Sequence, residues 1–355
     1  MKHRKSVLIT DLDNTLFDWV HLWHSCFDAM LDKIVEISGI PESKLKSEIR
    51  AVHQTHGTSE YAFLIEELPS LKEQFRDQDL LGVFDEAIQA YRIQRRRELR
   101  LYPSVAESLL KIKGAGAKIV GYTESMGFYS NYRVRRLGLD GIFEYIFSPA
   151  DHDIPKNLSP DQFRKYSVDQ YELRITKHEH TPPGELKPNK DILLSIIDKL
   201  GATVDDCVYV GDSLMKDVAM ARDASVSDVW AKYGIAQNSD AYSLLKEVTH
   251  WTDSDVRREG EIMKRDVATS TVLTHSFSQI FDFFMFGHKR AYYDLAELPR
   301  ISNEETKNII DIWKTTIDVQ KHFNDISLRI RGVFVTLIVA LSASIGFFCG
   351  ERMEC

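Results

Sequence analysis

The chain has little cysteine, and its cysteines are far apart in the sequence. The four among its 355 residues are Cys26, Cys207, Cys349 and Cys355, and no two of them form a CxxC pair. Structural zinc sites and disulfide frameworks depend on closely spaced or regularly repeated cysteines. We therefore expect neither, and free cysteines fit a reducing compartment.

An excess of positive charge is also missing. The chain has 45 Lys and Arg residues against 53 Asp and Glu residues, which gives a net charge of −8. A general nucleic-acid binder normally carries a basic face that neutralises phosphates, so we expect no nucleic-acid partner. Only a short apolar run follows the basic residues 2–5 before Asp11, so we expect no signal peptide.

One long apolar run is present near the C-terminus. Residues 332–350 (GVFVTLIVALSASIGFFCG) contain no charged side chain. About 20 apolar residues can cross a bilayer as a helix. A buried core helix is the alternative, but a soluble helix of this length normally shows a polar stripe, so we expect a transmembrane helix.

Basic residues precede this run, at Lys321, Arg329 and Arg331. The positive-inside rule then predicts a cytoplasmic catalytic domain that is anchored to the membrane at its C-terminal end. A soluble cytoplasmic protein is the alternative.

Short β-branched runs alternate with helical patterns along the first 250 residues. The runs predicted as strands are residues 6–10, 118–122, 144–147, 207–210 and 226–230. Such alternation is typical of an α/β fold, a Rossmann-like parallel sheet with helices on both faces. The helical stretch between the first two strands is predicted to be an inserted α-helical cap.

Four regions are expected from this pattern. A catalytic core is expected in residues 1–16 and 101–252, and a helical cap in residues 17–100. A helical extension is expected in residues 253–331 and the transmembrane helix in residues 332–350. Residues 148–185 hold five of the ten prolines and are predicted to form a long loop or a small β-hairpin.

The first predicted strand ends in Asp11 and Asp13. Residues i and i+2 of a strand point to the same side, and open α/β sheets bind ligands at the carboxyl ends of their strands. Two close carboxylates repel, which suits one nucleophile or metal ligand and one proton donor. A solvated turn is the alternative, because Asp is common in turns.

Three further motifs occur at strand ends or before helices. Thr123-Glu124-Ser125 follows a strand, Lys187-Pro188 precedes a helix, and Gly211-Asp212-Ser213 follows a strand, with Asp217 five residues after Asp212. Hydroxyls and backbone amides can hold a phosphate, and carboxylates are ligands for Mg²⁺. Taken singly, each motif is also compatible with a helix cap, a surface lysine or an ordinary turn.

Together and in this order, the motifs resemble those of the haloacid dehalogenase superfamily. The resemblance rests on Asp11-Leu12-Asp13-Asn14-Thr15-Leu16, Thr123, Lys187-Pro188 and Gly211-Asp212 with Asp217, and it extends over residues 7–230. It implies a Rossmann-like core, a helical cap that closes over the site, and the phosphatase branch of the superfamily.

The resemblance also implies roles for these residues. Asp11 would attack phosphorus and form an aspartyl-phosphate, and Asp13 would protonate the leaving oxygen and then activate water. Thr123, with Glu124 beside it, would line the phosphate site. Lys187 would balance the negative charge and position Asp11.

The metal implied by the resemblance is Mg²⁺. Asp11, the carbonyl of Asp13 and Asp212 would bind it, with Asp217 in support. Lys156 is an alternative to Lys187, because the stretch before Lys187 is longer than in typical members.

The expected activity is hydrolysis of a phosphomonoester of a small metabolite or nucleotide. Asp13 favours phosphoryl chemistry over dehalogenation, which has no leaving oxygen to protonate. A phosphotransferase or mutase of the same superfamily is one alternative. A membrane-tethered regulatory module on this scaffold is the other.

Several polar and aromatic residues outside the motifs are expected to have structural rather than functional roles. The triplet Arg95-Arg96-Arg97 could attract an anionic substrate, but a solvated helix face is the expected role. His178 and His180 are expected at the surface rather than as metal ligands. Trp19 and Trp23 are expected in the core rather than against a substrate ring.

Overall fold

The computed structural model describes residues 2–151, 170–235, 240–252 and 271–287, together with residues 257, 269, 307, 311 and 314. The chain divides into two units, Met1–Lys289 and Arg290–Cys355. The first unit contains nearly all of the described residues, including every predicted site residue except Lys156.

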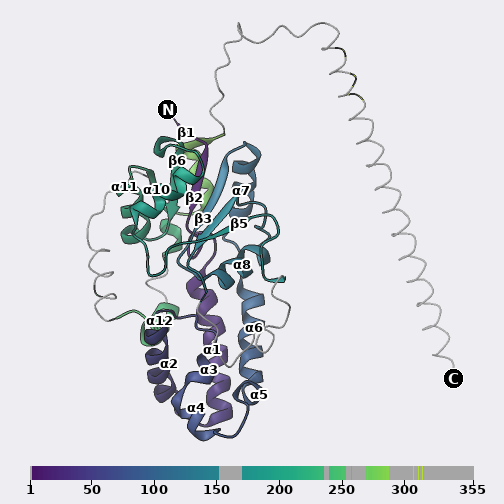
Figure 1. Cartoon of the computed structure of the whole chain (residues 1–355), viewed down its shortest axis with the longest axis vertical. Helices are drawn as coiled ribbons and strands as arrows, with labels where there is room; N and C mark the ends of the chain where they lie inside the picture. Colours follow the sequence, from purple (N-terminus) through teal and green to yellow (C-terminus); the bar gives the residue numbers. More distant parts are fainter. Residues whose placement is uncertain are drawn as a thin grey trace, which may run out of the picture. The chain divides into compact units, whose positions relative to one another are not determined.

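This unit contains a six-stranded parallel sheet, which lies in the upper part of Figure 1. Its strand order is β5-β4-β3-β2-β6-β7. The strands are β2 (Val7–Thr10), β3 (Lys118–Tyr122), β4 (Tyr145–Ser148), β5 (Lys177–His180), β6 (Cys207–Gly211) and β7 (Ser227–Trp230). The predicted α/β fold with a Rossmann-like parallel sheet is confirmed.

Strand β2 lies in the middle of the sheet and is buried on both faces. Leu8 packs in one hydrophobic cluster, while Val7 and Ile9 pack in another. Parallel strands covered by helices on both faces read as continuous apolar runs, and VLIT is such a run.

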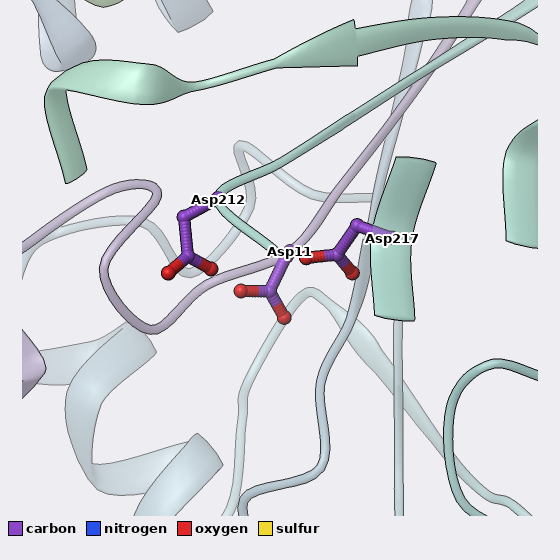
Figure 2. Close-up of side chains that lie close together, drawn as sticks. All are labelled: Asp11, Asp212 and Asp217. Atoms are coloured by element: carbon purple, nitrogen blue, oxygen red, sulfur yellow. The ribbon is translucent and has the colours of Figure 1, made fainter. Parts of the chain in front are cut away.

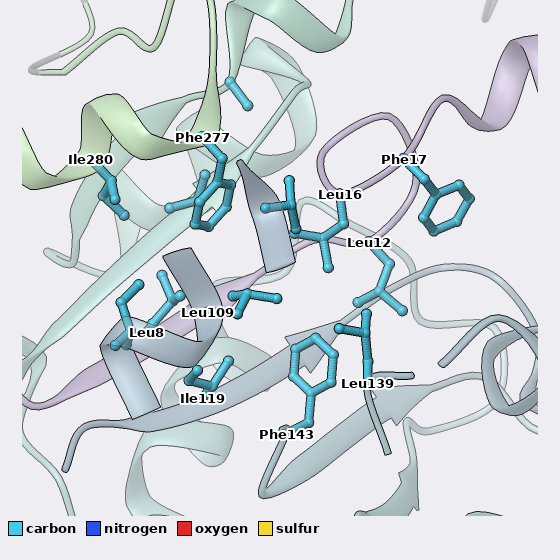
Figure 3. Close-up of a cluster of buried hydrophobic side chains, with 14 of the residues drawn as sticks. Leu8, Leu12, Leu16, Phe17, Leu109, Ile119, Leu139, Phe143, Phe277 and Ile280 are labelled. Carbon is cyan, nitrogen blue, oxygen red and sulfur yellow. The ribbon is translucent and has the colours of Figure 1, made fainter. Parts of the chain in front are cut away.

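Helices cover the two faces of the sheet separately. Helix α7 (Val105–Gly114) packs on the face of Leu8, through Leu109 and Ile112 (Figure 3). Helices α10 (Lys190–Lys199) and α11 (Ala219–Asp223) contribute to the opposite cluster. Helix α8 (Gly127–Arg136) follows β3, and a π-helical turn (Leu214–Val218) leads into α11.

A block of helices lies between β2 and β3 in the sequence, where a cap was expected. Its helices are α1 (Trp19–Ser38), α2 (Glu42–His56), α3 (Leu64–Glu67), α4 (Pro69–Gln74), α5 (Leu80–Val83) and α6 (Asp85–Glu98). Helix α1 is capped at its start by the Asp18 side chain, which accepts a hydrogen bond from His21 N. It ends at Gly39, whose φ of 68° is the left-handed conformation common at helix C-termini. Trp23 is 2% exposed in the core of this block, which confirms its expected burial.

Helix α12 (Asp240–Val248) joins this helical block although it follows the sheet in sequence. Tyr242, Leu245 and Val248 are buried in the same hydrophobic cluster as α1 and α2, and the helices lie together in Figure 1. The sequence pattern assigned residues 240–248 to the catalytic core. The exact domain boundaries stay a prediction.

A small second sheet was not expected from the sequence. Strands β1 (His3–Lys5) and β8 (Phe284–Phe286) pair in parallel. Phe277 and Ile280, just before β8, pack in the core cluster with Leu8 (Figure 3). The core of the unit therefore includes residues beyond 252.

The interpretation of residues 148–185 as a loop or small β-hairpin is wrong for its last part. Residues 177–180 form β5, which pairs in parallel with β4 at the edge of the sheet. The sequence KHEH has no apolar residue, so its sequence gives no sign of a strand. Its strand conformation depends on main-chain pairing with β4. Residues 152–169 lie outside the described residues.

Within the described residues, no helix is both long and apolar enough to cross a membrane. The apolar run 332–350 and almost all of residues 290–355 lie outside the described residues. The transmembrane helix, the helical extension and the membrane-anchored location therefore stay predictions.

Candidate active site

The loop after β2 carries the first two predicted site residues. It begins with Asp11, whose backbone N–H donates to Val210 O at 2.8 Å across to β6. Asn14 then adopts φ of 56°, a left-handed conformation that Asn tolerates better than most residues. Its side-chain oxygen accepts from Trp19 N and Val20 N, which ties the loop to the start of α1.

Three carboxylates come together at the carboxyl edge of the sheet (Figure 2). One carboxylate oxygen from each of Asp11, Asp212 and Asp217 lies within 4.8 Å of the others. Asp11 follows β2, Asp212 follows β6 and Asp217 lies in the turn before α11. Because β2 and β6 are paired neighbours, their ends bring two distant sequence motifs to one place.

Lys187 supplies a positive charge to this cluster. Its ammonium lies 2.6 Å from Asp11 Oδ1 and 2.9 Å from Asp217 Oδ1. The Lys187 side chain is buried, so both ion pairs are shielded from solvent. Neither the lysine nor its carboxylate partners can be removed without leaving a buried charge.

Asp217 is held by further donors on both of its oxygens. Tyr209 Oη donates to Oδ1 at 2.9 Å, and Ser213 N donates to Oδ2 at 3.1 Å. Gly211 leaves room for this carboxylate, because a Cβ at Gly211 would lie 2.2 Å from Asp217 Cγ. By contrast, among the described residues Asp11 Oδ2 has only a long contact of 3.4 Å from the Thr15 hydroxyl.

The cluster has more negative than positive charge. Three carboxylates and one ammonium sum to −2 when all are ionised. Burial raises the pKa of Asp11 to about 8, against the lowering effect of Lys187. Burial, with Asp11 as the next cause, also raises the pKa of Asp212 well above its ordinary value.

A divalent cation would balance this charge and favour the ionised carboxylates. Carboxylate oxygens are the ligands that Mg²⁺ prefers. The residues present therefore fit a divalent metal ion.

Asp13 has a separate set of partners. Its Oδ2 accepts from Ser125 Oγ at 2.6 Å and from Thr123 Oγ1 at 3.3 Å. Its Oδ1 lies 3.2 Å from Arg133 Nη1. Asp11 and Asp13 thus lie two residues apart but in different surroundings, one beside lysine and carboxylates, the other beside hydroxyls and a guanidinium.

Arg133 is the main residue that the sequence did not single out. It is 3% exposed and bridges Asp13 to Glu60, whose Oε1 lies 2.5 Å from Arg133 Nη2. Glu60 belongs to the helical block and Arg133 to α8. In the sequence Arg133 is one of three arginines in YRVRR, and nothing there distinguishes it from its neighbours.

Glu124 lies next to Thr123, where a free carboxylate would repel a phosphate. Its Oε1 accepts from Lys187 N at 2.8 Å, and its Oε2 pairs with Lys216 Nζ at 2.5 Å. Burial acts to raise the pKa of Glu124, but Lys216 and Lys187 outweigh it and hold the pKa below its ordinary value. Glu124 is therefore neutralised by lysines.

Some predicted residues stand apart from the site. Lys156, the alternative to Lys187, lies outside the described residues. His178 is partly buried on β5, between Ser148 Oγ and Asn131 Oδ1 at 2.7 Å each, so its expected surface position is wrong.

The expectation of a solvated arginine triplet is wrong for Arg95. Its Nε is buried, while Arg96 and Arg97 are exposed.

Comparisons with known proteins bear on this geometry. A family model described as HAD-hydrolase-like matches residues 186–254. The matched residues include Lys187, Asp212 and Asp217. A search of curated proteins found no match.

Several solved structures align with most of this chain. A 2-haloacid dehalogenase from Pseudomonas syringae pv. Tomato DC3000 is 18% identical, with 79% of this chain and 97% of that chain covered and a TM-score of 0.46. The putative HAD-hydrolase YfnB from Bacillus subtilis, bound to magnesium, is 13% identical, with 79% and 98% covered and a TM-score of 0.43. A HAD phosphatase from Thermococcus onnurineus is 17% identical, with 78% and 95% covered and a TM-score of 0.41.

The family model and the motifs agree on the segment that contains Lys187, Asp212 and Asp217. Residues 186–254 therefore match the HAD-hydrolase-like family, in agreement with the superfamily that the sequence motifs resemble.

Proposed function

We propose that the chain is a Mg²⁺-dependent phosphatase that hydrolyses a phosphomonoester of a small molecule through an aspartyl-phosphate on Asp11. The observation that carries this proposal is the different environment of two nearby carboxylates. Asp11 lies against Lys187 and two further carboxylates, while Asp13 accepts from Ser125 and Arg133. Two carboxylates in different environments suit two different roles.

In the first half of the reaction Asp11 is the nucleophile. Lys187 donates to Oδ1, and within the described part of the chain Oδ2 has only the long contact from Thr15. Oδ2 is therefore the freer oxygen to attack phosphorus. The Oδ2–P bond forms as the bond from phosphorus to the leaving oxygen breaks. Asp13 gives its proton to that oxygen.

In the second half a water molecule attacks phosphorus. Asp13 takes a proton from this water, the P–O bond to Asp11 breaks, and inorganic phosphate and free Asp11 result. Thr123 and nearby backbone amides are proposed to hold the phosphoryl oxygens. Lys187 stays with Asp11 throughout and offsets the charge of the transferred group.

The proposed metal-binding residues are Asp11, Asp212 and the carbonyl of Asp13. Asp217, whose oxygens accept from Lys187, Tyr209 and Ser213, is proposed to orient and support this set. When bound, Mg²⁺ supplies Lewis-acid stabilisation of the negative charge on the phosphoryl group.

Asp13 separates phosphoryl chemistry from dehalogenation. Displacement of a halide leaves no oxygen that needs a proton, so it gives no role to a second aspartate with its own donors. A phosphotransferase or mutase keeps every one of these residues. In that case the phosphoryl group is transferred to a second organic hydroxyl and no inorganic phosphate is released.

The test is phosphate release by the full-length chain from a panel of phosphorylated metabolites and nucleotides, with and without Mg²⁺. We expect Mg²⁺-dependent release that is lost in Asp11→Asn. Asp198→Asn, on the exposed face of α10, is the matched control and should keep full activity. Equal release by wild type and Asp11→Asn would contradict the proposal, and transfer to an added alcohol without phosphate release would favour the phosphotransferase.

A further inference from the structure

Three loops of the candidate site meet at the carboxylate of Glu124. This residue lies two positions after β3, next to Thr123. Its Oε1 accepts from Lys187 N at 2.8 Å, and its Oε2 pairs with Lys216 Nζ at 2.5 Å. One side chain therefore links the loop after β3, the segment before α10 and the turn before α11.

Each of these three loops also carries a predicted site residue. On the first loop, Thr123 Oγ1 donates to Asp13 Oδ2 at 3.3 Å. On the second, Lys187 Nζ lies 2.9 Å from Asp217 Oδ1. On the third, Asp217 directly follows Lys216. A shift of the Glu124 carboxylate would therefore displace groups of the site on all three loops.

The contacts of Glu124 differ from those of an ordinary surface ion pair, which contributes little to stability. The Glu124 side chain is 25% exposed and that of Lys216 is 33% exposed. Glu124 also accepts from the backbone of Lys187, whose side chain is buried. A charge-assisted bond to the main chain is stronger than a neutral one, and here it fixes the backbone from which the Lys187 ammonium extends.

The charge of Glu124 needs compensation, because the next residue, Thr123, is proposed to hold the phosphoryl group. Lys216 and Lys187 hold the pKa of Glu124 below its ordinary value, so the carboxylate is ionised at neutral pH and would repel an anion. Lys187 already pairs with two aspartates of the carboxylate cluster. Lys216 is therefore the cation that balances Glu124.

We propose that Glu124 is a positioning residue that holds the main chain of Lys187, and that Lys216 is the counter-ion that keeps Glu124 from repelling the phosphoryl group. This proposal rests on the proposed phosphatase function. Glu124 acts through Lys187, and Lys216 acts through Glu124. The two roles have different kinetic effects, because loss of positioning lowers kcat whereas an uncompensated charge weakens phosphate binding.

The positioning role is tested with two variants of Glu124 and para-nitrophenyl phosphate as substrate. Glu124→Gln keeps an oxygen that can accept from Lys187 N, and Glu124→Ala does not. We expect Glu124→Ala to lower kcat by about 10- to 100-fold and Glu124→Gln by less than about threefold, because small displacements of a catalytic group are costly. Thermal unfolding shows whether both variants are folded. Equal kcat in the two variants would overturn the positioning role.

The counter-ion role is tested with inorganic phosphate, whose binding is measured by titration calorimetry in the presence of Mg²⁺. Lys216→Met leaves the Glu124 charge uncompensated and should raise the Kd for phosphate by about 10-fold. Addition of Glu124→Gln removes that charge and should return the Kd to within about threefold of wild type. An equal loss of affinity in the single and the double variant would make Lys216 a direct phosphate ligand and overturn the counter-ion role.

The matched control is an ion pair on two elements that carry none of the site residues. Lys199 on α10 lies 2.7 Å from Glu179 on β5, and both side chains are partly exposed. Lys199→Met, Glu179→Gln and their double variant should leave kcat and the Kd for phosphate within about twofold of wild type.

The outcomes separate this proposal from the proposed function. If wild type hydrolyses phosphomonoesters and Glu124→Ala keeps the kcat of wild type, the positioning role is overturned while the phosphatase stands. If nothing is hydrolysed but the Kd for phosphate rises in Lys216→Met and recovers in the double variant, the counter-ion role stands and the phosphatase fails. A wild type that neither hydrolyses phosphomonoesters nor binds phosphate would overturn both.

Discussion

Arg133 is the residue through which Asp13 and the helical block are joined. It is almost completely buried and pairs with Asp13 on one side and with Glu60 on the other. Because Asp13 is the proposed proton donor, an altered orientation of its carboxylate should affect the chemical step more than substrate binding. Arg133 is therefore a positioning residue in this proposal.

We predict that Arg133→Met lowers kcat by about 10- to 100-fold and changes KM less. This loss is smaller than the full rate enhancement from general acid–base catalysis, because Asp13 itself remains. The unpaired Glu60 should also destabilise the fold by about 3 kcal/mol. Steady-state kinetics and chemical unfolding measure the two effects. The double variant Glu60→Gln with Arg133→Met should recover stability but not kcat, and the exposed Arg136→Met should change neither. Recovery of kcat in the double variant would show that Arg133 acts only through stability.

The carboxylate cluster should make the proposed Mg²⁺ binding depend on pH. Burial raises the pKa of Asp11 from 3.8 to about 8. The stability linked to this group is therefore fully present below about pH 4 and is lost as pH rises through about 8. A metal ion competes with the bound proton, so its binding releases that proton.

We predict that Mg²⁺ raises the melting temperature more near pH 8 than near pH 6, because fewer protons must be displaced at the higher pH. Thermal unfolding at fixed Mg²⁺ measures this, with Asp198→Asn as a control that should behave as wild type. Asp11→Asn should lose most of the difference between the two pH values. A larger Mg²⁺ effect at the lower pH would contradict the assignment of Asp11 as a ligand.

At the level of secondary-structure elements, the end of β6 and the turn after it form one half of the site. Gly211 ends β6, and a methyl group there would lie 2.2 Å from Asp217 Cγ and 2.4 Å from Asp217 Cβ. Such a contact forces the turn before α11 to move. Gly114, at the end of α7, has no atom within 4 Å of an added Cβ.

We predict that Gly211→Ala destabilises the protein by about 1–3 kcal/mol, as overpacking does, and weakens Mg²⁺ binding because Asp217 no longer meets Lys187. Gly114→Ala is the matched change and should be neutral or slightly stabilising, since alanine is the better helix former. Calorimetry with and without Mg²⁺ checks both. Unchanged Mg²⁺ affinity in Gly211→Ala would show that Asp217 is not needed for the metal site.

On the scale of the whole unit, the hydrophobic core extends beyond residue 252, where the sequence patterns end the predicted catalytic core. Strand β8 pairs with β1, and the segment before it adds buried side chains to the main core. These side chains are Leu273, Phe277, Ile280 and Phe284. Each such side chain contributes about 1.5–3 kcal/mol when it is buried.

We predict that residues 1–289 fold as stably as the full chain, because they make up the first compact unit. A chain ending at residue 252 should lose several kcal/mol or fail to fold, since four core side chains and the partner of β1 are removed. Urea unfolding of the two truncated chains tests this. If the chains ending at residues 252 and 289 were equally stable, residues 253–289 would not be needed for folding.

Local sequence by itself determined five of the six strands of the main sheet and which polar residues follow them. The apolar runs at β2, β3 and β6 are long enough to predict strands, and their carboxyl ends coincide with Asp11, Thr123 and Asp212. Because the carboxyl ends of parallel strands lie at one edge of the sheet, the sequence alone predicts that these motifs lie close together.

Only the tertiary structure decided which polar side chains complete the site. Ser125 and Arg133 donate to Asp13, Arg133 also donates to Ser125 and Glu60, and these partners lie 8 to 120 positions apart in the sequence. No local pattern encodes such pairs. Arg95 is partly buried, whereas the next two residues of α6 are exposed. Its inward orientation depends on contacts with Tyr132 of α8 and Tyr91 of α6.

The same holds for β5, β8 and α12. Strands β5 and β8 are short, and helix α12 has an apolar face of its own. Each is stabilised by a partner that is distant in sequence: β4, β1 and the helical block, respectively. Local sequence predicts elements that have a clear apolar pattern. The position of edge strands, and of helices that pack on distant segments, depends on the surface that they contact.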